Sequence, residues 1–122
     1  MAPARPDVVM GWGLRPSAQK ARAYAAQRGL PYIALEDGFL RSLGLGVAGW
    51  PPFSMVHDDI GIYYDTSHPS RLEQLLLAAD NMPSETLAEA QKAIGLIVAN
   101  RLSKYNHAPD FSETSSPQAV SG

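Results

Sequence analysis

Two short apolar runs on either side of an alanine-rich segment constrain the fold of this chain most. Residues 8–10 and 32–35 are long enough for buried strands and too short for helices. Between them, residues 18–28 repeat with helical period and place small or aromatic side chains on one face, at Ala18, Ala21, Tyr24 and Ala25. Gly29 follows as the residue type that most often ends a helix. This order predicts a right-handed β-α-β unit with parallel strands.

The ends of these elements carry turn-forming residues. Gly11-Trp12-Gly13 is expected to end the first strand, Arg15-Pro16 to form a turn, and Ser17 to cap the helix. In the same way, Glu36-Asp37-Gly38 directly follows the second apolar run.

Beyond residue 41 the pattern predicts shorter elements. A glycine-rich loop covers residues 44–49, strands are expected at 53–56 and 60–64, and His57-Asp58-Asp59 is expected to be a turn between them. Ser70 and Glu73 have capping-box spacing, which predicts a helix start. Its apolar stripe is Leu72, Leu75, Leu76 and Ala79. A last helix should run from Pro83-Ser84 to about residue 101, with Leu87, Ala90, Ile94, Ile97 and Val98 on one face.

Composition predicts one globular domain. The chain has 122 residues, a net charge of −2 and no cysteine, so disulfides and thiolate metal sites are excluded. No basic excess favours nucleic acid, no apolar run reaches the roughly 18 residues of a membrane span, and residues 1–6 lack a signal-peptide core. We therefore expect a cytoplasmic protein with a flexible N-terminus at 1–7, a domain at 8–111 and a disordered tail at 112–122.

Geometry links the two turn motifs. Parallel strands of a β-α-β unit end at the same edge of the sheet, so Gly11-Trp12-Gly13 should lie beside Glu36-Asp37-Gly38. Ligands of open α/β sheets bind at this edge, and the glycines and the helix N-terminus would admit one. Glu36 or Asp37 could then handle a proton or bind substrate hydroxyls. The structural alternative is that these acids cap a turn or pair with Arg15 or Arg41.

Other polar residues leave their roles open. Arg15 and Arg41 could bind a carboxylate or phosphate, or form ion pairs with Glu36, Asp37 or Asp58. Lys104 and Asn106 could contact a phosphate or sugar, although Lys104 would also suit a helix C-terminus. The cluster His57, Asp58, Asp59, Asp65 and His68 matches no metal-ligand signature, and no metal is predicted. Pro16 occupies the place of the third glycine of a dinucleotide fingerprint, so no NAD site is predicted.

Several long motifs occur in a familiar order. They are Gly11-Trp12-Gly13-x-Arg15-Pro16-Ser17, Glu36-Asp37-Gly38-Phe39-Leu40-Arg41-Ser42-Leu43-Gly44-Leu45-Gly46, Pro51-Pro52-Phe53-Ser54, Asp58-Asp59-x-Gly61-Ile62-Tyr63-Tyr64-Asp65, Pro69-Ser70-x-Leu72-Glu73 and Leu102-Ser103-Lys104-Tyr105-Asn106. Over residues 8–111 the chain resembles the KpsC family of capsular polysaccharide biosynthesis proteins, which are bacterial retaining β-Kdo glycosyltransferases.

The resemblance implies a fold and a function. It implies an α/β fold, a Rossmann-like three-layer half of a GT-B-type module, with short parallel strands and about three helices. Family members are cytoplasmic, peripheral to the inner membrane, and use CMP-Kdo as donor without a further cofactor. They build the short Kdo linker of the capsule on a phosphatidylglycerol lipid. The expected site residues are Asp37 and Glu36 as catalytic carboxylates, with Gly11, Trp12, Gly13, Arg15, Arg41, Ser42, Lys104 and Asn106 binding substrate.

The resemblance also predicts an incomplete module. Family members continue past the Leu-Ser-Lys-Tyr-Asn motif into a CMP-binding half that this sequence does not contain. We therefore expect an acceptor-side half-module that is inactive alone and needs the second half or other capsule assembly proteins. The alternatives are a non-catalytic scaffold or binding module complemented by a separate chain, and a remnant without function.

Overall fold

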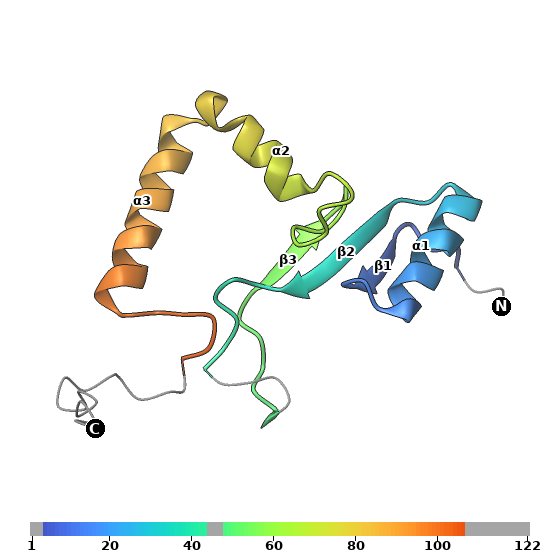
Figure 1. The fold of residues 1–122 in the computed structure, drawn as a ribbon, viewed down its shortest axis with the longest axis horizontal. Coiled ribbons are helices and arrows are strands. Elements are labelled where there is room, and N and C mark those ends of the chain that lie inside the picture. The colour runs from blue at the N-terminus through green and yellow to red at the C-terminus, as the bar shows by residue number, and fades with distance from the viewer. Residues whose placement is uncertain (1–3, 44–47, 107–122) are drawn as a thin grey trace, which may run out of the picture.

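A three-stranded mixed sheet forms the centre of the molecule. The computed structural model describes residues 4–43 and 48–106. Its strands are β1 (Val9–Trp12), β2 (Tyr32–Asp37) and β3 (Met55–Asp58), in the spatial order β1-β2-β3 (Figure 1). β1 and β2 pair in parallel, with Val9 opposite Tyr32 and Trp12 opposite Leu35. β2 and β3 pair antiparallel.

The predicted β-α-β unit is confirmed, with small shifts at its ends. Helix α1 (Pro16–Arg28) ends at Gly29, whose φ of 63° is the left-handed conformation expected of a C-terminal glycine. The helix begins before Ser17, so the prediction that Ser17 is its N-cap was wrong. Arg15 holds that position and makes no side-chain cap, while Pro16 fits the first turn, where its missing N–H costs nothing.

Both strands of this unit run further than the sequence indicated. Gly11 and Trp12 belong to β1, and Glu36 and Asp37 belong to β2. Gly11 has to be small, because a Cβ atom there would collide with Ala18 of α1 and the hydroxyl of Tyr32. The two acids therefore lie within a strand, whose side chains alternate between the two faces of the sheet.

The antiparallel pairing of β3 corrects the prediction of parallel strands. The described part of the connection, residues 38–43 and 48–54, contains no α-helix, whereas a parallel neighbour is usually joined through a crossover helix. His57 and Asp58 lie in β3, so they do not form the predicted turn, and residues 60–64 form an irregular segment that ends in a turn at Tyr63 and Tyr64 instead of a strand. The buried Asp58 side chain causes this, because its Oδ1 accepts the N–H groups of Ile60 and Gly61 at 2.9 and 2.8 Å.

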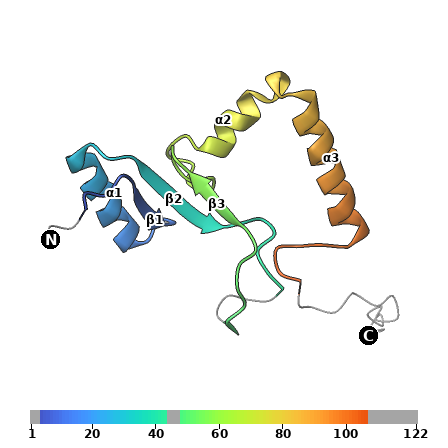
Figure 2. The same ribbon diagram turned by 180° about the vertical axis from the view of Figure 1, so that it is seen from behind.

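Two helices stand away from the sheet. Helix α2 (Arg71–Leu77) begins at Ser70, whose hydroxyl accepts the N–H of Glu73, as the sequence predicted. A single 3₁₀ turn, η2 (Ala79–Asn81), leads to α3 (Ser84–Ala99). Figures 1 and 2 show α2 and α3 as an arm that leaves the sheet after β3 and returns after α3. Neither helix buries a residue, so the side chains of their predicted apolar stripes stay partly or largely exposed among the described residues.

Within the described residues only one face of the sheet is covered, which corrects the prediction of three layers. Helix α1 packs on the face that carries Gly11 and the fully buried Ala34. On the other face, Met10 and Met55 remain 51% and 48% exposed, and no described helix covers them. None of the helices in residues 4–43 and 48–106 has the length and hydropathy needed to cross a membrane. The expected tail at 112–122 and the motif residues 44–46 lie outside the described residues.

The buried carboxylate of Asp58 yields a stability prediction. It accepts backbone N–H groups from Ile60, Gly61 and Arg71, the last to both of its oxygens. Asp58→Ala should lower the free energy of unfolding by about 2–4 kcal/mol, because hydrogen bonds to a charged group are worth about 1.5–3 kcal/mol each and the bonds share one carboxylate. Urea denaturation followed by circular dichroism measures this change.

The matched control is the neighbouring acid. Asp59 is exposed and pairs with the Arg71 guanidinium at 2.7 Å, so Asp59→Ala should cause a much smaller loss. Equal losses for the two variants would contradict the role assigned to Asp58.

Candidate functional site

Polar residues gather where β1 and β2 end. The Gly13 N–H donates to the carbonyl of Leu35 at 2.8 Å, which places Gly11-Trp12-Gly13 beside Glu36-Asp37-Gly38. The adjacency of the two motifs predicted from the β-α-β geometry is thus confirmed. The first turn of α1 follows at the same edge, so its backbone N–H groups face the region of the two motifs.

On the α1 face of the sheet, Glu36 forms a cluster with Tyr64 and Gly13. The Tyr64 hydroxyl donates to Glu36 Oε2 at 3.0 Å, and Glu36 Oε1 accepts the N–H of Asp37 at 2.9 Å. Gly13 has a φ of 55°, and a Cβ atom there would meet both the Tyr64 hydroxyl and Glu36 Oε2. Burial, followed by the hydrogen bond to Glu36, raises the pKa of Tyr64 above its usual range. A neutral phenol therefore holds the Glu36 carboxylate in place.

On the opposite face, Asp37 forms an ion pair with Arg41. Asp37 Oδ1 and Arg41 Nε lie 2.7 Å apart, and the side chains are only 21% and 12% exposed. Both atoms are fully buried and lack any other partner among the described residues, so each depends on the other for its charge compensation. The ion pair that the sequence offered as the structural alternative for Asp37 and Arg41 is therefore present.

Strand alternation separates the two acids, although they are adjacent in sequence. Glu36 faces α1 and Tyr64, whereas Asp37 lies on the open face with Arg41. A single substrate group cannot be held between two neighbouring side chains that point in opposite directions. The two carboxylates thus belong to different microenvironments.

The segment after α3 returns to Arg41 and Ser42. The N–H of Arg41 donates to the carbonyl of Lys104 at 3.0 Å, and Ser42 forms a parallel bridge with Tyr105. The side-chain amide of Asn106 donates to the carbonyl of Ser42 at 3.3 Å and to that of Ser103 at 2.8 Å. Figure 1 shows the returning chain beside the loop that follows β2. We call this contact between residues 41–42 and 104–106 the junction; it joins four predicted site residues, Arg41, Ser42, Lys104 and Asn106.

The two remaining cations differ in their surroundings. Lys104 Nζ lies 5.9 Å from the centre of the Tyr105 ring, a cation–π distance that leaves its charge unpaired by any described acid. Arg15 is exposed, and its guanidinium forms no ion pair or hydrogen bond within the described part of the chain. Both cations are available to an anionic group.

Gly11 and Trp12, which are predicted to bind substrate, also have packing contacts within the sheet and α1. The side of Gly11 that lacks a side chain is filled by Ala18 and Tyr32, so the glycine allows α1 to approach the sheet. Trp12 lies half-buried on the open face, opposite Leu35.

Three residues of this region were missed by reasoning from sequence. Tyr64 was assigned to a strand, which hid its hydrogen bond to Glu36. Tyr105 bridges Ser42 through its backbone, so its side-chain type carries no signal. Asp58 had been grouped with possible metal ligands, yet its oxygens are occupied by N–H groups. Within the described residues no group of three or more His, Asp or Glu side chains could hold a metal ion.

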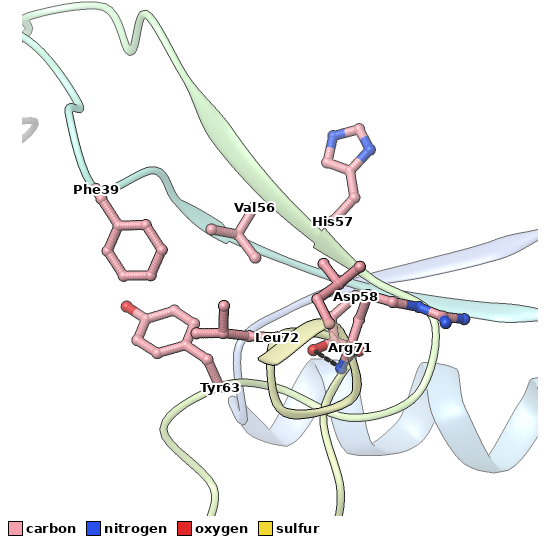
Figure 3. Close-up of a pocket in the computed structure, with 8 residues that line it drawn as sticks. Phe39, Val56, His57, Asp58, Tyr63, Arg71 and Leu72 are labelled. Carbon is pink, nitrogen blue, oxygen red and sulfur yellow. Dashed lines mark hydrogen bonds between the residues drawn. The ribbon is translucent and has the colours of Figure 1, made fainter. Parts of the chain in front are cut away.

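A pocket of about 200 Å³ lies between the sheet and α2 (Figure 3). Its wall is mainly apolar, and its lining residues are Phe39, Val56, His57, Asp58, Tyr63, Arg71, Leu72 and Leu75. The rings of Phe39 and Tyr63 are tilted against each other with centroids 5.1 Å apart. In Figure 3 the His57 ring points away from these rings. The hydrogen bond from Arg71 lowers the pKa of Asp59 and ties the guanidinium to that exposed acid.

Comparison with known proteins identifies the family. Residues 7–116 match the model of the capsule polysaccharide biosynthesis protein family. The chain belongs to this family. It is 71% identical over 107 residues to the capsule polysaccharide modification protein LipA of Neisseria meningitidis serogroup B, and 40% identical over 106 residues to the lipopolysaccharide-processing protein LpsZ of Rhizobium meliloti.

Solved structures give the same assignment. KpsC of Thermosulfurimonas dismutans, described as a beta Kdo 2,4 transferase, superposes on 92% of this chain with a TM-score of 0.82 and 42% identity. Its beta Kdo 2,7 transferase superposes on 87% with a TM-score of 0.55 and 34% identity. The resemblance stated from the motifs is thus confirmed. This member of the capsule polysaccharide biosynthesis family spans 15% of LipA, 24% of LpsZ and 35% of the first KpsC chain.

The Tyr64–Glu36 hydrogen bond predicts a pH dependence. The raised pKa of Tyr64 means that the contribution of this residue to stability is fully present below about pH 10, its unfolded value, and is lost as the pH rises through the folded value. Glu36→Gln should lower the pKa of Tyr64 only partway, because burial remains. NMR of ¹³C-labelled tyrosine across pH 8–12 measures it, with Tyr64→Phe assigning the signal. An unchanged Tyr64 pKa in Glu36→Gln would show that the carboxylate does not contribute.

Proposed function

We propose that this chain forms one wall of the active site of a retaining β-Kdo transferase that takes Kdo from CMP-Kdo. The observation that carries the proposal is the superposition on the KpsC beta Kdo 2,4 transferase, at 42% identity and over 92% of this chain. The acceptor in this proposal is a phosphatidylglycerol lipid, and the product is the Kdo linker of a capsule chain. The site lies in a cytoplasmic module peripheral to the inner membrane.

The charges at the site suit these substrates. Kdo carries a carboxylate, and CMP-Kdo and the lipid each carry a phosphate, so every reactant brings a negative charge. Arg15 and Lys104, which have no acidic partner among the described residues, would bind such groups. Arg41 is neutralised by Asp37, so we assign it first to fixing the loop after β2 and second to substrate contact through its remaining N–H groups.

The carboxylates take separate roles in this proposal. A retaining sugar transfer by double displacement needs a carboxylate nucleophile and an acid or base. Glu36 lies at the edge where β1 and β2 end, beside the α1 N-terminus, and the Tyr64 phenol keeps it oriented. Asp37 is the candidate site carboxylate of the open face, held by Arg41. Because this chain spans 35% of the KpsC chain, neither residue is assigned as the nucleophile.

A scaffold role is the second candidate. In that case the junction and the arm would serve to hold a separate polypeptide, and the polar cluster would be structural. The ion pair between Asp37 and Arg41 favours this alternative, because it gives both residues a role without substrate.

The first prediction is that the purified 122-residue chain alone transfers no Kdo. Incubation with CMP-Kdo and a phosphatidylglycerol acceptor, followed by mass spectrometry of the lipid, tests it. The reason is that one face of the sheet and both helices of the arm lack partners, so the second wall of a site is missing from the described residues. Turnover by this chain would contradict the view that further polypeptide is required.

The second prediction concerns Arg15 in a complete enzyme. We would replace the matching segment of the KpsC beta Kdo 2,4 transferase by this chain and measure Kdo transfer. Arg15→Ala should lower kcat/KM by about 10- to 100-fold, the loss expected for one charge-assisted contact of about 1.5–3 kcal/mol. The control is Lys20→Ala, which removes an exposed cation of the helix that follows Arg15 and should have no effect on Kdo transfer.

Asp37→Asn in the same chimera separates a catalytic from a structural role of this acid. Unchanged Kdo transfer with normal folding would make Asp37 structural, as the scaffold candidate expects.

A further inference from the structure

We propose that the apolar pocket between β3 and α2 is a docking site for apolar side chains from the remainder of a KpsC-type module. This remainder is the polypeptide that the longer relatives possess outside the segment matched here. The inference rests on the proposed function, because it names the protein partner that would complete the same site. Its test reads stability and does not depend on Kdo transfer.

The chemistry of the pocket selects an apolar occupant. Phe39, Val56, Tyr63, Leu72 and Leu75 form most of its wall. Its charged groups already have partners: the Asp58 carboxylate accepts backbone N–H groups, and the Arg71 guanidinium is paired with Asp59. The other polar groups of the lining are the Tyr63 hydroxyl and the His57 ring, and the ring points away from Phe39 and Tyr63 (Figure 3). A phosphate would find no unpaired charge of opposite sign there, whereas an apolar side chain would replace water against apolar walls.

The residues around the pocket are exposed in a way that folded monomers avoid. Leu75 is 50% exposed, Leu76 is 66% exposed and Phe39 is 58% exposed, although all three are large and apolar. Leu72, Leu75 and Leu76 share one face of α2, so the exposed side chains form a continuous stripe that ends in the pocket. Contiguous apolar surface of this kind marks a protein interface more often than a solvated surface.

The comparison with KpsC indicates what covers this stripe. With a TM-score of 0.82 over 92% of this chain, the arm holds a similar place in the KpsC chain. The match occupies 35% of that chain, so 65% of its polypeptide lies elsewhere. A helix pair that stands away from its own sheet, and keeps that position within a much larger protein, is positioned to pack against the rest of that protein.

The experiment places one charge in the pocket in two contexts. Leu75→Glu is made in this chain alone and in meningococcal LipA whose 107 matching residues are replaced by this chain, an exchange at 71% identity. In the chimera, Leu75→Glu should lower Tm by about 5 °C or more, because the charge would be buried on docking. In the isolated chain it should change neither the helix content nor the Tm, because Leu75 is exposed there.

Leu77→Glu is the matched control. Leu77 lies two residues further along α2, is 81% exposed and does not line the pocket, so its substitution should leave Tm unchanged in both contexts. Mixing the isolated chain with LipA lacking the 107 residues gives a second measurement: wild type and Leu77→Glu should bind, and Leu75→Glu should bind at least tenfold more weakly.

Three results would overturn the proposal. The first is an equal Tm change for Leu75→Glu and Leu77→Glu in the chimera. The second is a dimer of the isolated chain that Leu75→Glu dissociates, which would make a second copy the occupant. The third is binding to phosphatidylglycerol vesicles that Leu75→Glu abolishes while the chimera keeps its Tm, which would make the occupant a lipid chain. For the proposed activity the same segment is exchanged in the KpsC beta Kdo 2,4 transferase. The predicted Tm pattern in the LipA chimera together with loss of Kdo transfer in the KpsC chimera would leave docking intact and reject the proposed activity.

Discussion

The arm formed by α2 and α3 is attached to the sheet at its two ends, and the rest of the described structure depends on these attachments. At its start, the Asp58 carboxylate accepts the N–H of Arg71 with both oxygens and thereby fixes the first residue of α2 to the end of β3. At its end, Arg101 takes a φ of 51° and turns the chain back, so that residues 104–106 reach the junction with Arg41 and Ser42. Between the ends, neither helix buries a residue. Their position is set by polar contacts, whereas a helix in a globular domain is usually held by its apolar face.

How far the sequence predicts this fold depends on the distance over which each interaction acts. The β1-α1-β2 unit, Gly29 and the cap at Ser70 are local, and periodicity and spacing predicted them correctly. The antiparallel β3 and the junction depend on contacts between residues far apart in the sequence, and Asn106 reaches Ser42 across 64 positions. No pattern of apolar residues encodes such a contact. Asp58 shows both kinds of interaction: it lies in β3 and not in the turn expected at residues 57–59, its carboxylate caps the residues that follow, and its bond to Arg71 fixes the first residue of α2.

The candidate site shows the same division. The meeting of the two motifs at one edge of the sheet followed from the β-α-β geometry and is present. The end of β2 could not be predicted from the sequence. The prediction placed Glu36 and Asp37 after the strand, whereas both belong to it. Two residues of strand are enough to change the chemistry, since alternation then assigns each acid to a different face and to a different partner, Tyr64 or Arg41.

Glu36 and Asp37 lie on opposite faces of the sheet, and this affects how a complete enzyme could use each carboxylate. The Asp37–Arg41 pair lies on the sheet face that no described helix covers, at the base of the loop that meets the junction. If further polypeptide packs against this face, the pair loses solvent and its mutual attraction strengthens, as does the cost of breaking it. Glu36 sits on the covered face, at the glycine that ends β1, and needs no such addition to be oriented. The orientation of Glu36 is therefore set by contacts within the described residues, whereas the environment of Asp37 depends on whether the open face of the sheet is covered.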